Sequence, residues 1–241
     1  MAGAEIPTKK SDLAVRAASA LVMLLVAGTA LWLGGWLWTA FVVAVALGVL
    51  WEWWGLVSKL AFKMSTQALW MCVATVYVLT ASATLWAARE NRGITLVVLI
   101  LGAVVATDVG AYFAGRTLGG PKIAPKISPS KTWSGLLGGM LASGLMLGSY
   151  FVFGLYHAGS PTYDDVPDWM AMLMGVIIGA VVAVIAQCGD FFESWMKRKA
   201  GVKDSGNIIP GHGGLFDRLD GILAVSFVIG LFSLPALLTP I

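Results

Sequence analysis

Three aspartates in the last quarter of the chain have the spacing expected of a metal site. Asp190 ends one long apolar run, and Asp217 and Asp220 open another, three residues apart and so on one face of a helix that begins there. Ionised acids at membrane depth are costly, so a functional reason for them is the default. Convergent carboxylate oxygens suit magnesium, which commonly also binds substrate phosphates, and calcium is a chemically possible alternative.

Basic side chains lie between these acids and indicate that the substrate is a polyphosphate. A metal ion and cationic side chains together neutralise phosphate oxygens while a displacement at phosphorus spreads charge in its transition state. For Arg198 and Lys199, an equally weighted alternative is that they bind anionic lipid or set the membrane topology. The basic residues of this segment are Lys197, Arg198, Lys199, Lys203 and Arg218.

A glycine-rich turn around His212 adds a second kind of phosphate-binding group. The sequence Pro-Gly-His-Gly-Gly, residues 210–214, predicts a tight backbone that exposes N–H donors to an anion. His212 itself is suited to contact phosphate or to orient a ligand. A general base is not required if the attacking group is a phosphate, because that group is largely ionised at neutral pH.

Further polar residues lie upstream. Asp108 and Tyr112 recur at helical spacing and predict a polar stripe, although a helix–helix hydrogen bond would also explain Asp108. The following PKISPSKTW brings Ser128 and Lys131 into a proline-stiffened loop that presents hydroxyl and cationic groups. Glu52, within LWEWWGL, is interpreted as a structural or cavity-lining acid.

The elements that must position these residues are membrane-spanning helices. Of the 241 residues, 58% are hydrophobic and 12% are charged, and the mean hydropathy is +0.83. A helix needs about 20 apolar residues to cross the hydrocarbon core, and the sequence lacks the alternation typical of a membrane barrel. We therefore predict an all-α, polytopic transmembrane bundle of about seven spans. The predicted spans are residues 14–33, 36–57, 67–88, 94–115, 135–156, 170–190 and 219–239.

The charge distribution predicts how this bundle is oriented. With a cytoplasmic N-terminus, every Lys and Arg except Arg89 and Arg92 lies on the cytoplasmic side, as the positive-inside rule expects. The long polar loops 116–134 and 191–218 then share that side with nucleotides. We expect one integral-membrane domain, residues 1–241.

The polar segments resemble those of one enzyme family. Ser194 to Asp220 carries Ser, Lys-Arg, Lys-Asp, Pro-Gly-His-Gly-Gly and Asp-Arg-x-Asp at intervals that resemble the signature of phosphatidate cytidylyltransferases, also called CDP-diacylglycerol synthases. DVGAYFAGRTLGG and PKISPSKTWSG are similar to a second block of that family, so the catalytic segments lie within residues 107–221. The resemblance implies that CTP and phosphatidic acid give CDP-diacylglycerol and pyrophosphate, with magnesium required and a potassium ion beside it.

The resemblance also implies roles for individual residues and a set of partners. It assigns catalysis to Asp190, Asp217, Asp220, Lys197 and Arg218, of which the three aspartates would hold the metal. It assigns contacts with the substrate phosphates to Ser128, Lys131 and Lys203, and we also expect Asp108, Asp204 and His212 to bind substrate. The implied partners are CTP, phosphatidic acid and membrane lipids, with no nucleic acid, and a homodimer is left open. The implied location is a bacterial inner membrane, with the site facing the cytoplasm.

Two other functions fit the same residues less closely. A related CTP-dependent enzyme would act on another lipid, either as a cytidylyltransferase on an ether-lipid phosphate or as a polyprenol kinase. A cation-coupled transporter would also place acids inside a membrane. Transporters often show interrupted helices in both halves of the chain, whereas the polar signals here are concentrated in the second half.

Overall fold

The structure is a computed structural model that describes residues 10–60, 62–154 and 166–239, with side chains from Ala14 onward. Helices make up most of it, and one small sheet interrupts them. The elements are α1 (Lys10–Leu33), α2 (Gly35–Val57), α3 (Met64–Arg92), α4 (Ile94–Thr117), β1 (Lys122–Ala124), β2 (Ser128–Thr132), α5 (Trp133–Ser149), the π-helical turn η1 (Tyr150–Gly154), α7 (Asp168–Lys199) and α8 (Phe216–Leu238).

Seven of the described helical segments are long and apolar enough to cross a membrane, at 20 to 32 residues each. This confirms the predicted all-α bundle of seven spans. The main boundary difference is in α7, which continues to Lys199 rather than ending near residue 190. An apolar-run criterion stops at the first charge, whereas the helix continues past it and carries an ion pair between Glu193 and Lys197 one turn apart.

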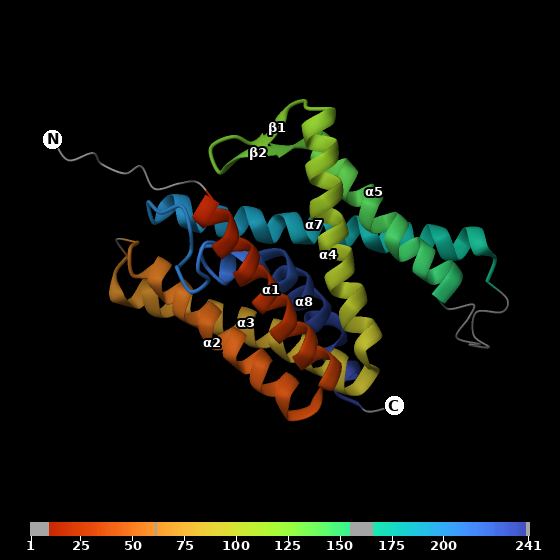
Figure 1. Ribbon diagram of the computed structural model, residues 1–241, viewed down its shortest axis with the longest axis horizontal. Coiled ribbons are helices and arrows are strands. Elements are labelled where there is room, and N and C mark those ends of the chain that lie inside the picture. The colour runs from red at the N-terminus through yellow and green to blue at the C-terminus, as the bar shows by residue number, and fades with distance from the viewer. Residues whose placement is uncertain (1–9, 61, 155–165, 240–241) are drawn as a thin grey trace.

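The loop between α4 and α5 is a hairpin, which the sequence did not predict. β1 and β2 pair antiparallel, with Lys122 opposite Thr132 and Ala124 opposite Ser128. Figure 1 shows the hairpin projecting beyond the helices where α4 and α5 meet. At its end, the Thr132 side chain accepts a hydrogen bond from the Gly135 backbone N–H at 3.1 Å and so caps α5. The hairpin is therefore attached directly to a membrane helix.

Close backbone approach brings the acid-bearing helices together. A Cβ atom at Gly189 of α7 would lie 2.5 Å from the Asp220 carbonyl oxygen of α8. A Cβ atom at Gly139 of α5 would lie 2.9 Å from the Thr107 carbonyl oxygen of α4. Because any side chain at these glycines would push the helices apart, glycine sets the spacing of the polar groups on them.

An aromatic core lies behind the acids. Trp53 of α2 is fully buried, and its ring centroid lies 5.2 Å from that of Phe216 at the start of α8. It lies 5.5 Å from the ring of Phe192 on α7. Burial and ring contact therefore fix α2 against the two helices that carry the aspartates.

The two exceptions to the charge bias have structural partners. Arg89, in the last turn of α3, donates from Nε to the Leu31 carbonyl oxygen of α1 at 2.6 Å. Arg92 donates to the Ala236 carbonyl oxygen of α8 at 2.5 Å. Cations at helix C-termini satisfy free carbonyls and complement the helix dipole. The compartment that each end of the bundle faces stays a prediction.

Candidate active site

An acidic cluster forms where α7 meets α8. Asp190 and Glu193 of α7 and Asp220 of α8 each offer a carboxylate oxygen, and these three oxygens lie within 4.8 Å of one another. Glu193 is 1% exposed, and its Oε1 has no hydrogen-bond partner among the described residues. A buried, unpaired carboxylate oxygen beside two other acids suits a hard divalent cation.

Asp217 lies next to this cluster but is held by protein donors. Its Oδ2 accepts hydrogen bonds from the Ser205 backbone N–H at 2.8 Å, the Ser205 hydroxyl at 3.0 Å and the Gly214 N–H at 2.9 Å. Its Oδ1 accepts from Lys197 Nζ at 2.5 Å. The observed cluster thus contains Glu193 in the place that the sequence assigned to Asp217, and direct metal ligation by Asp217 stays a prediction.

Lys197 links the cluster to Asp217. Its Nζ lies 2.6 Å from Glu193 Oε2 and 2.5 Å from Asp217 Oδ1. All three side chains are largely buried, so the cation compensates two acids in a medium that screens charge weakly. This residue, predicted as catalytic, contacts both acids from the last turn of α7, and its role in catalysis stays a prediction.

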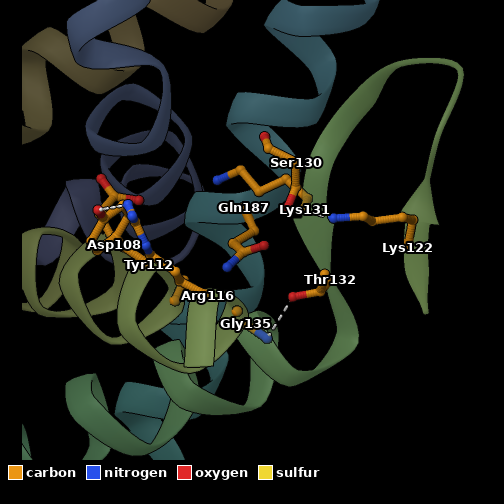
Figure 2. A pocket seen from close by; sticks show the side chains of 11 residues that line it. Asp108, Tyr112, Arg116, Lys122, Ser130, Lys131, Thr132, Gly135 and Gln187 are labelled. Carbon is orange, nitrogen blue, oxygen red and sulfur yellow. Dashed lines mark hydrogen bonds between the residues drawn. The ribbon is translucent and has the colours of Figure 1, made fainter. Parts of the chain in front are cut away.

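A cavity of about 550 Å³ that is lined by several charged side chains opens beside the cluster, between α4, the hairpin, α5 and α7. The hairpin and the cluster are joined by an ion pair, since Lys131 Nζ lies 2.5 Å from Asp190 Oδ2. Arg116 donates a hydrogen bond to the Tyr112 hydroxyl at 2.7 Å, which holds its guanidinium on α4. Figure 2 shows the lining side chains, among them Asp108, Tyr112, Arg116, Lys122, Ser130, Lys131, Thr132 and Gln187.

Gln187 stands out within this cavity. It is 3% exposed, and neither its amide nitrogen nor its amide oxygen has a hydrogen-bond partner among the described residues. Figure 2 shows its side chain in the middle of the lining residues. An unpaired buried amide costs about 1–3 kcal/mol, so a ligand that pairs it would recover that free energy.

The predicted residues His212 of the α7–α8 loop and Arg218 of α8 contact each other. His212 sits in a tight turn between Gly211 and Gly213, whose φ angles of +75° and +84° favour glycine. Its Nδ1 lies 2.8 Å from the Ser19 hydroxyl of α1, and Arg218 donates to its carbonyl oxygen at 2.6 Å. The expected tight backbone is present, but the N–H groups of His212 and Gly214 donate to the Ile209 carbonyl oxygen and to Asp217 Oδ2, so they are not exposed to an anion as predicted.

Three further predicted residues occupy different surroundings. Lys203 and Asp204 are exposed on the α7–α8 loop. Ser128 is buried at the start of β2, whereas its neighbours Ser130 and Lys131 line the cavity. The structure therefore brings Asp108 and Lys131 to one cavity and leaves direct contacts of Ser128, Lys203 and Asp204 as predictions.

Sequence reasoning did not single out Glu193 or Gln187. Both lie three residues from Asp190, so a helix that continues past Asp190 would have placed all three on one face. It also did not assign Arg116 and Lys122, although both precede the PKISPSKTW segment. The missing signal was the hairpin, which turns Lys122 back toward the cavity.

Seven membrane-length helices and an acidic cluster beside a basic cavity define an integral membrane protein with a site able to hold a cation. The comparisons with known proteins narrow this class. A family model described as "Cytidylyltransferase family" matches residues 58–234. The chain belongs to the cytidylyltransferase family.

Individual relatives carry a more specific name. A phosphatidate cytidylyltransferase of Brucella suis biovar 1 (strain 1330) is 43% identical over 143 residues, which cover 59% of this chain and 48% of that protein. A phosphatidate cytidylyltransferase of Rickettsia bellii (strain RML369-C) is 33% identical over 237 residues, which cover 93% of this chain and 94% of that protein. The matched region thus spans about half the length of the Brucella relative and nearly all of the Rickettsia one.

Proposed function

We propose that this chain transfers a cytidylyl group from CTP to phosphatidic acid, giving CDP-diacylglycerol and pyrophosphate. The observation that carries the proposal is the meeting of Asp190, Glu193 and Asp220 beside the lysine-bearing cavity, with Lys131 in contact with Asp190. Acids that hold a cation and bases that hold phosphate oxygens belong together in phosphoryl-transfer sites. The printed name of the relatives supports the same reaction.

The acidic cluster would hold magnesium. Asp190, Glu193 and Asp220 supply the oxygen ligands that this ion prefers, and the unpaired Oε1 of Glu193 is a buried acceptor that a cation would satisfy. When bound, magnesium would neutralise charge on the nucleotide phosphates. Asp217, fully engaged with Lys197 and the α7–α8 loop, would support the cluster from behind.

The cavity residues would bind and orient the nucleotide. Lys131, Arg116 and Lys122 would supply positive charge for the phosphates, and Asp108 and Gln187 would supply polar contacts in the same cavity. The phosphate oxygen of the lipid forms a bond to the α-phosphorus of CTP, while the bond from that phosphorus to the bridging oxygen breaks and pyrophosphate leaves. Holding the two reactants in line would be the main contribution of the protein.

The seven membrane-length helices support a lipid as the acceptor of the cytidylyl group. A diacyl lipid stays in the bilayer while its phosphate reaches a site at the ends of α4, α7 and α8. We propose that this end faces the cytoplasm, where CTP is available, and that the membrane is a bacterial inner membrane. The charge bias of the loops supports that orientation.

Isotope position in CTP tests the reaction directly. Purified protein in mixed micelles with phosphatidic acid and magnesium should move label from α-labelled CTP into lipid, and omission of magnesium should abolish the transfer. Label that reaches lipid from γ-labelled CTP would instead indicate a kinase, and preference for an ether-lipid phosphate would change the substrate. Solute flux into liposomes without CTP turnover would overturn the proposal in favour of a transporter.

A further inference from the structure

A buried acid on α2 contacts the α7–α8 loop from outside the cavity. Glu52 is 3% exposed and lies before residues 58–234, the segment matched by the family model. We infer that Glu52 is a positioning residue that holds the α7–α8 loop and the start of α8, and so places Asp217 and Asp220 for the reaction. The catalytic part of this inference rests on the proposed function.

Hydrogen bonds connect Glu52 to the loop. Its Oε1 accepts from the Leu215 backbone N–H at 2.9 Å, and its Oε2 accepts from the Phe216 N–H at 2.8 Å. Oε2 also accepts from the Ser205 hydroxyl at 2.8 Å. These contacts join residues more than 150 positions apart in the chain.

Two of these donors are free N–H groups of the α8 N-terminus. Leu215 is the residue that precedes the helix, and Phe216 is its first residue. The first N–H groups of a helix have no partner within the helix, and the helix dipole favours negative charge there. Glu52 thus caps the N-terminus of α8 from another helix. The hydrogen bonds from α8 offset the free-energy cost of burying the Glu52 carboxylate.

The loop backbone runs directly against this carboxylate. A Cβ atom at Gly214 would lie 2.6 Å from Glu52 Oε2, and one at Gly206 would clash with Glu52 Oε1. Any other residue at these positions would displace either the loop or the acid. Close contact with Glu52 therefore gives a steric reason for glycine at both positions, and this reason is separate from phosphate binding.

Glu52 and Asp217 both accept hydrogen bonds from the same loop. The Ser205 hydroxyl lies 2.8 Å from Glu52 Oε2 and 3.0 Å from Asp217 Oδ2, and its single proton serves one of them at a time. Asp217 in turn contacts Lys197, which contacts Glu193 of the acidic cluster. A shift of the Glu52 carboxylate would therefore reach the cluster through Asp217 and Lys197.

Glu52→Gln tests this role because it keeps the shape of the side chain and replaces one acceptor oxygen by a donor. That donor would face a backbone N–H or the Ser205 hydroxyl. Misplacement of reacting groups by about 1 Å can cost 10²-fold, so we expect turnover per folded molecule to fall about 10- to 100-fold. The magnesium concentration for half-maximal activity should rise, while the Michaelis constant for CTP should change less.

Glu90→Gln is the matched control. Glu90 also accepts a hydrogen bond from a backbone N–H, that of Gly35 at 2.8 Å, but it lies on α3 at the other end of the bundle. Its turnover and magnesium dependence should equal those of the wild type. Equal losses in both variants, or a Glu52→Gln variant that loses only thermal stability, would overturn the inference.

Trypsin cleavage after Lys203 measures the position of the loop without any substrate. Lys203 is exposed on the loop, and cleavage there should become several-fold faster in Glu52→Gln and in Ser205→Ala, but not in Glu90→Gln. Unchanged cleavage in both loop variants would overturn the inference, even if Glu52→Gln folds poorly. Wild-type protein that is protected at Lys203 but does not turn over CTP would overturn the proposed function alone.

Discussion

The two sides of the acidic cluster differ in how completely their polar groups are paired. On the loop side, Asp217 and Glu52 accept hydrogen bonds from backbone N–H groups, Ser205 and, for Asp217, Lys197. Gln187 in the cavity lining and Glu193 Oε1 in the cluster itself have no partner within the described residues. A paired buried network is rigid, whereas unpaired buried groups carry a free-energy cost that a ligand can remove.

This difference separates residues that hold the structure of the site from residues that are available to bind a ligand. Sequence reasoning placed Asp190, Asp217 and Asp220 in one class because all are aspartates at helix ends. The contacts divide them, since Asp190 and Asp220 join Glu193 in the cluster while Asp217 faces the loop. Substitutions on the two sides should therefore change different measurable quantities.

The largest effect on turnover is expected on the cluster itself. Asp220→Asn removes one charged ligand from the predicted magnesium site, so turnover should fall about 10²- to 10³-fold, the usual loss for a preorganised charge-stabilising group. Thermal stability in detergent should be equal to or above that of the wild type, because fewer like charges then crowd the cluster. Wild-type turnover at saturating magnesium would remove Asp220 from the site.

Asp217→Asn should instead weaken the hydrogen bonds that hold the α7–α8 loop. It removes one of the two negative partners of Lys197 and weakens the hydrogen bonds that the loop donates to a charged acceptor, so the protein should lose about 1.5–3 kcal/mol of stability, and turnover should fall about 10- to 100-fold with it. Thermal unfolding in detergent and turnover per folded molecule are the two measurements. A large rise in the magnesium requirement without loss of stability would place Asp217 among the ligands and erase the distinction between the two sides.

Lys131→Ala is expected to act on binding. The side chain reaches from the hairpin to Asp190, and its loss should raise the Michaelis constant for CTP about tenfold, or about 1.4 kcal/mol, with a smaller change in turnover. Lys126→Ala is the matched control, because Lys126 is exposed at the turn of the same hairpin. An equal effect of both changes would show that charge on the hairpin matters more than contact with the cluster.

Gln187→Leu should have the smallest effect on turnover. Unlike Asp217→Asn, it should not lower stability. Replacement of an unpaired buried amide by an apolar side chain of similar size is neutral or stabilising, so the unfolding temperature should not fall. If substrate pairs the amide, kcat/KM for CTP should fall about three- to tenfold. An unchanged kcat/KM would mean that the amide stays unpaired during catalysis.

Much of this fold was predictable because hydrophobic length is a local property. Seven apolar runs became seven helices, with ends that moved by several residues where charges follow the run. The hairpin was missed because its strands are only three and five residues long, and the second contains Pro129. Short strands of this kind have no periodicity long enough to detect.

The site was predictable only where residue type and spacing were sufficient. The aspartates and the basic residues could be named, but the exchange of Glu193 for Asp217 in the cluster depends on which side chains the loop engages. Glu52 was visible as an acid at membrane depth, yet its partners lie more than 150 residues away. Contacts at that separation follow from the packing of α2 on α8 and have no counterpart in local sequence.

The length of α7 ties the chemistry to the thickness of the surrounding bilayer. The 32 residues of this helix extend about 48 Å, compared with about 30 Å for a hydrocarbon core. The rise from Asp168 to Asp190 alone is about 33 Å, so an untilted α7 that enters the hydrocarbon core at Asp168 would place the acids where the lipid tails end. A thicker bilayer would draw Asp190 and Glu193 toward the tails unless the helix tilts less, and lipid chain length would then tune the hydration of the reacting phosphates.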